Sequence, residues 1–251
     1  MCAVKTVSNN KIKEIVKLHQ KKYREETGLF LAEGEKILEE LINEKIDIVE
    51  VFALKTFDNS KLNINPTIVD EQTMKKISTT SSICEVLAIA KKQDIQIDKF
   101  SKLKRIALLD SISDPGNLGT IIRSAAAFGI EGIILYGNCV DKYSSKVIRS
   151  TAGNFFKIPI IEIDSIEYLK KHFDKHTFVA TALSKQNNIS LKECSKIDNY
   201  ILMLGSEAKG LTNDLIDITN KNIKLEMKKN VESLNLSVCA SIIFYELFIN
   251  G

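Results

Sequence analysis

The sequence predicts an α/β protein with two domains, and three observations support this. Short apolar runs of strand length alternate with amphipathic helical stretches from residue 29 onward. The segment 91–104 interrupts this alternation, because it is rich in Lys, Gln and Asp and poor in apolar residues. A chain of 251 residues with 44% hydrophobic and 27% charged side chains is typical of a globular protein, which excludes disordered, collagen-like and coiled-coil classes.

The first part of the chain predicts a small α/β domain over residues 1–93. Apolar and β-branched runs indicate the strands, and helical periodicity indicates the helices between them. We expect strands at residues 29–32, 46–54, 67–69 and 83–90, with helices at 33–43 and from 70 onward. Residues 94–104 are expected to form the linker to the second domain.

The first 24 residues are strongly basic, with seven Lys and Arg side chains and one acid, Glu14. Their spacing predicts a helix with Ile12, Ile15, Val16 and His19 on one face. Such a run is usually a solvated helix flank, and contact with RNA or DNA phosphates is the alternative. The basic residues are Lys5, Lys11, Lys13, Lys17, Lys21, Lys22 and Arg24.

Residues 105–251 predict a larger alternation, and therefore a mostly parallel sheet covered on both faces. The expected strands are 105–109, 132–135, 178–182, 200–204 and 223–225. The expected helices are 118–128, 142–150, 166–171, 211–216 and 234–248. In such a sheet, ligand sites lie at the loops that follow the carboxyl ends of the strands.

Several catalytic motifs are absent from the sequence. Eleven glycines form no G-x-G, which argues against a dinucleotide site. Residues 205–210 have the glycine spacing of a Walker loop, but Leu211 and Thr212 stand where its Lys and Ser/Thr should be. His172 and His176 are spaced i, i+4 without further ligands, so no metal site is expected. No G-x-S-x-G elbow is present.

Cysteine usage and hydropathy indicate the compartment. Five scattered cysteines without a C-x-x-C pair predict reduced, mostly buried thiols and neither a disulfide framework nor a zinc ribbon. No run approaches the ~18 apolar residues of a membrane span, and residues 1–23 lack the apolar core of a signal peptide. A cytoplasmic location is therefore expected.

Three polar, glycine-marked segments stand where strand-to-helix loops are expected. The first, residues 114–123, opens a helix that Asn117 can cap, and Gly119 permits a close approach. It ends in Arg123, which lies more than one turn further along among apolar residues. A guanidinium there needs an anionic partner, so a ligand contact and a structural salt bridge are the two interpretations.

The second and third segments follow later strands. Residues 204–211 form a strand end and a glycine-bracketed loop with one acid, Glu207. Residues 233–238 begin the last helix, where Ser233 or Asn235 can act as the N-cap. An ordinary capped helix would also explain this third segment.

Taken together, the three segments resemble the motifs of the SpoU/TrmH family of RNA ribose 2'-O-methyltransferases, in the SPOUT superfamily. Their order, spacing and strand-loop-helix contexts all match. Residues 17–24 followed by 29–34 are similar to the family's N-terminal substrate-binding domain, a ribosomal-protein-like α/β RNA-binding module. The first motif contains Asn117, Gly119 and Arg123. The second comprises residues 205–211, and the third comprises residues 232–238, which begin with Glu232.

The resemblance implies a trefoil-knot domain that binds S-adenosylmethionine, and a homodimer with RNA bound across both subunits. Main-chain groups of Gly205, Leu225 and Leu234 would contact the cofactor. Side chains that would line its pocket are Leu204, Ser206, Met227 and Leu236. The sequence departs from the family pattern at Ser206, Lys209 and Glu226.

The resemblance also suggests roles in methyl transfer. Arg123 would hold the target phosphate and stabilise the developing alkoxide, while Asn117, Ser233 and Asn235 orient the ribose. Glu207 would order its loop, or, as the less favoured alternative, act as the base. Arg123 as the base itself also stays open, although an arginine is not ordinarily deprotonated. The residues expected to bind RNA are Lys17, Lys21, Lys22, Arg24 and Arg149.

We therefore expect an S-adenosylmethionine-dependent RNA 2'-O-ribose methyltransferase that requires no metal. Large-subunit (23S) rRNA is favoured as the substrate, because the N-terminal module resembles that of the ribosomal-RNA branch. The alternatives are a tRNA 2'-O-methyltransferase and a non-catalytic RNA-binding protein of the same fold.

Overall fold

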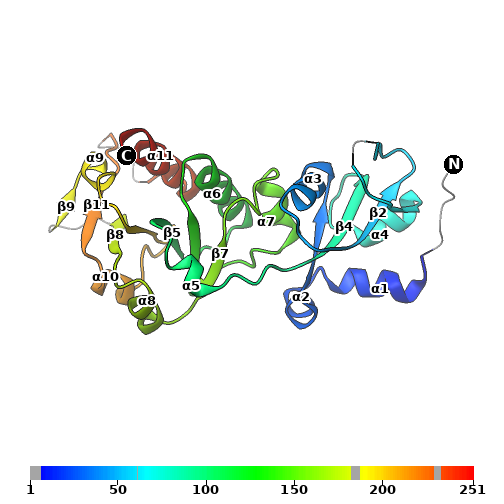
Figure 1. The fold of residues 1–251 in the computed structure, drawn as a ribbon, viewed down its shortest axis with the longest axis horizontal. Coiled ribbons are helices and arrows are strands. Elements are labelled where there is room, and N and C mark those ends of the chain that lie inside the picture. Colours follow the sequence, from blue (N-terminus) through cyan, green and yellow to red (C-terminus); the bar gives the residue numbers. More distant parts are fainter. Residues whose placement is uncertain (1–6, 61, 182–186, 229–232) are drawn as a thin grey trace. The chain divides into compact units, whose positions relative to one another are not determined.

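The computed structural model describes residues 7–60, 62–181, 187–228 and 233–251. Cys2, Lys5 and Glu232 lie outside these residues. The chain divides into two compact units, each with its own sheet (Figure 1). Unit 1 comprises Met1–Asp94 with Asp141–Phe156, and unit 2 comprises Ile95–Val140 with Lys157–Gly251. The predicted mixed α/β fold is confirmed.

Unit 1 is built on a four-stranded sheet in the order β1-β4-β2-β3. Strand β4 pairs antiparallel with β1 and β2, and β2 pairs parallel with β3. The strands are β1 (Leu29–Glu33), β2 (Ile48–Leu54), β3 (Thr67–Val69) and β4 (Val86–Lys91). The helices are α1 (Asn9–Lys17), α2 (Lys21–Thr27), α3 (Glu35–Asn43), α4 (Glu71–Ile77) and α7 (Ser145–Ser150). One core cluster includes Ile15 of α1, Phe52 of β2 and Met74 of α4, all about 1% exposed or less.

The basic N-terminal segment forms two helices where the sequence predicts one. Helix α1 ends at Lys17, and α2 begins at Lys21. His19 lies in the intervening turn, where its Nε2 is 2.9 Å from the carbonyl oxygen of Ile77. Ile15 is buried as expected, whereas Val16 is 37% exposed, so the predicted apolar face is only partly correct.

The segment Asp141–Phe156 packs within unit 1, although it follows strand β6 (Gly132–Tyr136) of unit 2 in the chain. Its aromatic residues are buried in a cluster around Phe30 of β1, with ring centroids 5.0 Å apart for Phe30 and Tyr143. The amide of Phe156 donates to Glu40, a buried carboxylate of α3. The expected second domain included this segment, because a helical pattern does not reveal which sheet the helix covers.

Arg24 and Asp141 form a buried ion pair in unit 1, with side chains only 5% and 8% exposed. The Arg24 Nε donates to Asp141 Oδ2 at 2.8 Å, and its Nη1 donates to the carbonyl oxygen of Leu18 at 2.6 Å. The guanidinium is thus occupied by internal partners. Burial contradicts the expectation that Arg24 is a surface contact for RNA.

Unit 2 contains a seven-stranded parallel sheet in the order β7-β6-β5-β10-β8-β11-β9. The strands are β5 (Arg105–Asp110), β6 (Gly132–Tyr136), β7 (Ile160–Ile163), β8 (Thr177–Thr181), β9 (Asn188–Ile189), β10 (Tyr200–Leu204) and β11 (Lys221–Ile223). The predicted strands are all present with shifts of up to two residues, whereas β7 and β9 at the two edges were not predicted. Edge strands escape prediction here because they are short and only partly buried.

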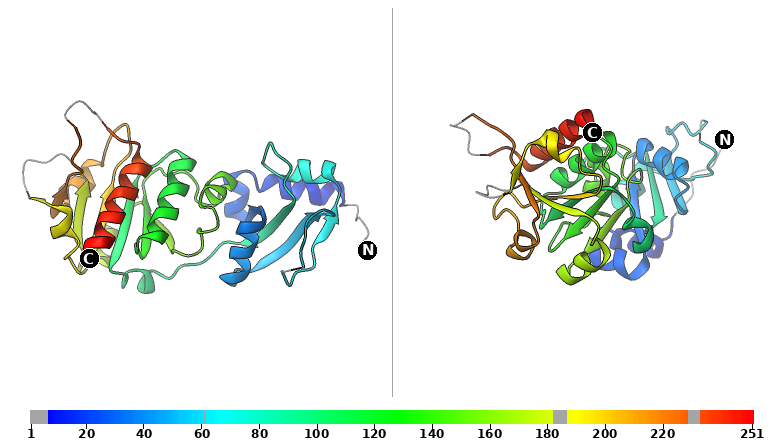
Figure 2. Two further views of the ribbon diagram at one scale, coloured as in Figure 1. Left: turned by 90° about the horizontal axis from the view of Figure 1, so that it is seen from above. Right: turned by 60° about the vertical axis from the view of Figure 1, so that its left-hand side comes forward.

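The helices of unit 2 are α5 (Ile97–Phe100), α6 (Pro115–Ala127), α8 (Ile166–His172), α9 (Leu191–Cys194), α10 (Asn213–Asp217) and α11 (Leu236–Asn250). Helix α6 begins three residues earlier than predicted, because Asp114 and not Asn117 is its N-cap. Helix α5 lies in the expected linker, and its Phe100 is 1% exposed within the core of unit 2. Helices α6 and α11 lie side by side (Figures 1 and 2).

The cysteines that the structure describes are Cys84, Cys139, Cys194 and Cys239, and all four are free thiols. Burial raises the pKa of Cys194 to about 11, so this side chain stays protonated at neutral pH. Among the described residues, no helix is long and apolar enough to span a bilayer.

The buried Arg24–Asp141 pair generates a stability prediction. Asp141→Asn leaves a buried guanidinium without its counter-charge, so we expect unfolding free energy to fall by about 3 kcal/mol. Asp47→Asn is the matched control, because Asp47 pairs with Lys91 at the surface, where the side chains are 61% and 59% exposed. The control should cost less than about 1 kcal/mol. Urea unfolding followed by circular dichroism measures both, and equal effects would contradict the prediction.

Candidate functional site

The site of unit 2 lies where loops follow the carboxyl ends of neighbouring parallel strands. Strands β5 and β10 pair in parallel, with Leu204 opposite Leu109, so their following loops begin at the same edge. The first loop leads from Asp110 into α6, and the second spans residues 205–212. Residues 233–235 bring a third polar segment to the start of α11. This is the position at which parallel sheets bind ligands.

A single carboxylate oxygen joins the three polar segments. Glu207 Oε1 accepts hydrogen bonds from Asn117 Nδ2 at 2.7 Å, Asn235 Nδ2 at 3.3 Å and the amide of Leu236 at 3.3 Å. Asn235 Nδ2 also donates to Asn117 Oδ1 at 3.0 Å. The structure therefore brings together Asn117, Glu207 and Asn235, one residue from each predicted motif.

Helix capping fixes the orientation of the Asn235 side chain. Its Oδ1 accepts from Ser237 N at 3.0 Å, Ser237 Oγ at 2.6 Å and Val238 N at 3.3 Å, so it is the N-cap of α11. With the oxygen turned to the helix, the amide nitrogen must face Glu207 and Asn117. One side chain thus both starts the helix and links the loops. The sequence left Ser233 and Asn235 as the two candidate N-caps of this helix, and the structure shows that the cap is Asn235.

Asp110 is a site residue that the sequence analysis missed. This fully buried carboxylate ends β5, accepting from Thr212 N through Oδ2 at 2.7 Å and from Ser111 Oγ through Oδ1 at 2.9 Å. It therefore ties the first loop to the end of the second. Ser111 has a φ of 56°, which is unusual for a residue with a side chain. The available signal was an acid at the end of an otherwise apolar strand.

A cavity of about 270 Å³ lies beside this network. Eight of its lining residues were named from the sequence: Gly205, Ser206, Glu207, Leu225, Met227, Ser233, Leu234 and Leu236. Lining residues that were not named are Thr181, Gly210, Lys224, Cys239 and Ile243. Leu204 is not among the described lining residues; it is 1% exposed in the sheet.

Beyond the polar network, the cavity wall consists of apolar side chains, a neutral thiol and a few polar groups. Burial raises the pKa of the Cys239 thiol, so at neutral pH it lines the cavity as a neutral group and not as a thiolate. Leucine, methionine and isoleucine side chains supply the apolar surface, and Ser206, Lys224 and Ser233 add polar groups. Such a mixture suits a ligand with a flat apolar part and a polar part.

Gly205 is required by the close approach of the loop to itself. A Cβ atom at this position would lie 2.1 Å from Gly210 C and 2.3 Å from Leu211 N, well inside van der Waals contact. Ser206 and Gly210 exchange backbone hydrogen bonds of 3.1 and 2.8 Å, which close the loop. Gly210 itself has a φ of 69°, in the region that glycine favours.

Arg123 lies on an exposed position of α6. It has no ion-pair or hydrogen-bond partner among the residues that the structure describes. The structural salt bridge that was one interpretation of this residue is therefore not formed within them. As far as the described part of the chain is concerned, the guanidinium keeps its N–H donors available for an anion.

The remaining predicted RNA contacts lie in unit 1. Lys17 stacks over the Tyr23 ring at 5.3 Å from its centroid. Lys21 and Lys22 make exposed i, i+4 pairs with Glu25 and Glu26. Arg149 on α7 is ion-paired with Glu33, so it is not an isolated surface cation.

No group of three or more potential ligands for a metal ion is found among the described residues. His176 is 8% exposed and its Nε2 is 2.7 Å from the carbonyl oxygen of Leu103. His172 packs its ring against Tyr168, with centroids 4.2 Å apart. The two histidines thus contact different residues, Leu103 and Tyr168.

Comparison with known proteins identifies the class. The SpoU rRNA Methylase family matches residues 104–245, and the MRM3-like substrate binding domain matches residues 9–88. The chain belongs to the SpoU rRNA methylase family, in the SPOUT class that its fold and motifs indicated.

Particular relatives cover almost the whole chain. The 23S rRNA (guanosine(2553)-2'-O)-methyltransferase RlmP of Bacillus subtilis is 28% identical over 98% of this chain and 99% of its own. The AdoMet-bound rRNA methyltransferase of Sinorhizobium meliloti is 27% identical with a TM-score of 0.85, over 97% of this chain and 96% of its own. The SpoU methyltransferase AviRb of Streptomyces viridochromogenes has a TM-score of 0.84 at 20% identity, covering 96% and 98%, which supports the fold.

The crowding at Gly205 generates a prediction about the loop. Gly205→Ala should force residues 205–211 apart, because the added Cβ meets backbone atoms that cannot rotate away. We expect faster hydrogen exchange in this loop and at the start of α11. Ala208→Ser is the control, since it enlarges an exposed residue of the same loop. Unchanged exchange in Gly205→Ala would show that the loop tolerates a side chain there.

Proposed function

We propose that the protein is an S-adenosylmethionine-dependent RNA 2'-O-ribose methyltransferase that acts on large-subunit rRNA. The observation that carries this proposal is the network of Asn117, Glu207 and Asn235 beside the cavity. Support comes from the relatives, which include a 23S rRNA 2'-O-methyltransferase and an AdoMet-bound rRNA methyltransferase. A cytoplasmic location belongs to this proposal, as does the trefoil knot, which stays a prediction.

The cavity residues fit the proposed cofactor. Leu225, Leu234 and Leu236 offer an apolar wall for an adenine ring, and the loop at Gly205 exposes backbone without an intervening side chain. The volume of about 270 Å³ is near the lower end for ligand sites, ~300 Å³. When bound, S-adenosylmethionine supplies an activated methyl group. The protein therefore mainly has to position the ribose and assist the loss of the proton from its 2'-hydroxyl.

The hydrogen-bond geometry favours a positioning role for Glu207. One of its oxygens already accepts three N–H donors from the other two segments, so this oxygen is engaged in holding the loops together. We assign the holding of the loops to Glu207 and the orientation of the ribose to Asn117, Ser233 and Asn235. Arg123, with no internal partner among the described residues, is assigned to the target phosphate and the developing alkoxide.

RNA binding in unit 1 is assigned to exposed lysines. Lys17, Lys21 and Lys22 lie on α1 and α2 and remain solvent-accessible. The salt bridges of Lys21 and Lys22 are exposed and weak, so exchange of a glutamate partner for a phosphate costs little. Arg24 is left out of this group, because it is buried with Asp141.

The central experiment maps ribose methylation in rRNA from cells with and without the protein. One 2'-O-methyl group in 23S rRNA should be lost with the protein and restored by its re-expression. Loss from a tRNA would select the tRNA alternative. Retention of every methyl group, with no heat on titration with S-adenosylmethionine, would select a non-catalytic RNA-binding protein.

Arg123 provides a test of the assigned roles. Arg123→Ala should lower methyl transfer about 100-fold or more, because it removes a charge that acts on the transition state. Affinity for S-adenosylmethionine, measured by calorimetry, should stay within about twofold. Lys192→Ala on α9 is the control, since Lys192 is an exposed cation of the same unit. Equal loss of turnover and cofactor affinity in Arg123→Ala would reduce Arg123 to a structural residue.

The homodimer is the other part of the proposal. Helix α11 exposes an apolar stripe of Val238, Ile242, Tyr245 and Ile249, at spacings of four, three and four residues and 37% to 52% exposed. An apolar stripe on a helix is expected to be covered in the functional state. A second copy of the chain is the occupant that fits the family.

We therefore predict that the double variant Ile242→Lys and Tyr245→Lys is monomeric, because it places two charges in the stripe. Light scattering coupled to size-exclusion chromatography measures the mass. Ile216→Lys on α10 is the control, at a residue that is 50% exposed outside α11. A monomeric unsubstituted protein, or a double variant that still dimerises, would contradict the proposal.

A further inference from the structure

Unit 1 contains a cavity of its own, of about 260 Å³, apart from the proposed methyltransfer site. It lies among the end of β1, the start of α3 and the loop that precedes β4. Its lining includes Glu33, Glu35, Phe57, Ile83, Glu85 and Arg149. The proposed function makes no use of these residues.

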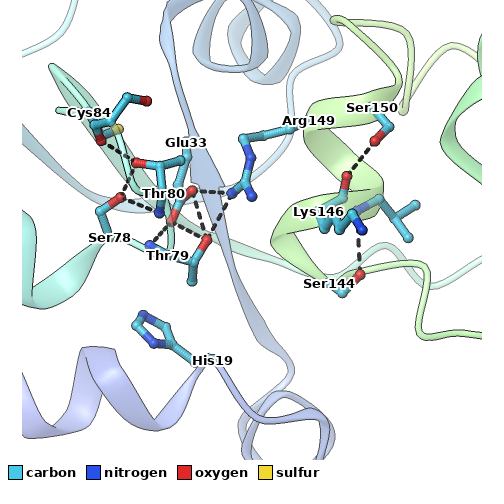
Figure 3. A network of polar contacts seen from close by, with 12 residues as sticks. His19, Glu33, Ser78, Thr79, Thr80, Cys84, Ser144, Lys146, Arg149 and Ser150 are labelled. Carbon is cyan, nitrogen blue, oxygen red and sulfur yellow. Dashed lines mark hydrogen bonds and ion pairs between the residues drawn. The ribbon is translucent and has the colours of Figure 1, made fainter. Parts of the chain in front are cut away.

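An ion pair between the buried Glu33 and the partly exposed Arg149 forms one wall of this cavity. Glu33 is 1% exposed, and its carboxylate accepts from Arg149 Nη1 and, at 2.7 Å, from the amide of Thr79. Arg149 Nη1 also donates to Thr79 Oγ1 at 2.8 Å. Figure 3 shows Arg149 extending from α7 toward Glu33 and Thr79. The charge of Glu33 is thus balanced, and the guanidinium is held in one place.

The held guanidinium keeps donors for a ligand. Only its Nη1 has partners among the described residues, whereas Nε and Nη2 are not used by them. The Arg149 side chain is 31% exposed and lines the cavity, so these donors are accessible. A fixed guanidinium with free N–H groups binds planar groups that carry two acceptors.

Two further carboxylates give the cavity a negative balance. Glu35 and Glu85 are exposed and lack an ion-pair partner among the described residues, although Glu85 Oε1 accepts from Thr56 Oγ1 at 3.2 Å. With the Glu33–Arg149 pair neutral, these acids disfavour an isolated phosphate. They favour a neutral group that offers N–H donors on one edge and acceptors on another.

The other walls suit a flat ring. Ile83 is 51% exposed, and Phe57 is partly exposed on the loop after β2. Single-stranded RNA is recognised by unpaired bases that stack on such side chains and present their edges to polar groups. The combination of a flat apolar surface, a guanidinium and carboxylates therefore matches a nucleobase.

We infer that this cavity binds an unpaired guanine of the RNA substrate, an inference that rests on the proposed function for its RNA ligand. Guanine O6 and N7 are the acceptor pair that an arginine binds in bidentate fashion. Its N1–H and N2–H₂ groups form a donor pair for a carboxylate, Glu35 or Glu85. Adenine and the pyrimidines lack one pair or the other.

Fluorescence anisotropy with the full-length protein tests the inference. The probes are three labelled ten-nucleotide RNAs, uridines throughout except for one central guanosine, adenosine or inosine. The guanosine RNA should bind about tenfold tighter than the adenosine RNA, the size expected for one bidentate base contact. The inosine RNA, which lacks the N2 amino group, should lie between them.

Variants connect this preference to the cavity. Glu35→Gln combined with Glu85→Gln should reduce the guanosine preference, because it removes the charged acceptors for N1–H and N2–H₂ while Arg149 keeps its contact, and Phe57→Ala should weaken binding of both RNAs. Glu44→Gln is the matched control, because it removes an exposed carboxylate beyond the other end of α3. Circular dichroism checks the fold of each variant.

The outcomes separate this inference from the proposed function. Equal binding of the three RNAs, no binding of any of them, or a guanosine preference that is unchanged in the double glutamine variant overturns the guanine site. Guanosine preference in a protein that transfers no methyl group would leave the site standing and remove the proposed function. Affinity for S-adenosylmethionine should be the same in the cavity variants and the unsubstituted protein.

Discussion

The carboxylate of Glu207 is the interaction on which the site depends. Three polar segments, far apart in the chain, meet at one of its oxygens through Asn117, Asn235 and the amide of Leu236. Ordering loop residues costs about 1–2 kcal/mol each in conformational entropy. Hydrogen bonds to a charged acceptor return about 1.5–3 kcal/mol each, so a single shared carboxylate can offset much of that cost. One shared carboxylate therefore joins the three segments with fewer ordered side chains than separate hydrogen-bonded pairs would need.

This carboxylate works only because the sheet and a second acid prepare its position. Parallel pairing of β5 and β10 starts two of the loops at the same edge. Asp110, fully buried, then fixes the second loop through the amide of Thr212. Gly205 lets that loop fold onto its own backbone, and the turn presents Glu207. The strand order thus sets where the loops begin, and Asp110, Gly205 and Glu207 then hold them in the arrangement of the site.

Much of the fold and the candidate site could be predicted from the sequence, but the contacts between residues far apart in the chain could not. Strand positions and the three motif segments follow from apolar periodicity and glycine spacing. The N-cap of α6 was assigned to Asn117, because Asp114 and Asn117 are both good caps and only the backbone decides. Arg24 looked like the lysines around it in a basic run. Its burial depends on Asp141, which is more than a hundred residues away.

The ion pairs of two arginines, Arg24 and Arg149, also affect the electrostatics of RNA binding. In unit 1, Arg24 and Arg149 are paired with Asp141 and Glu33, so neither adds free positive charge. The net charge of the chain is only +3. RNA affinity that came from phosphate contacts alone would be modest and would fall steeply with salt. Under the proposed function, selection of one rRNA site would therefore depend on shape and base contacts, such as the contact proposed for the cavity of unit 1.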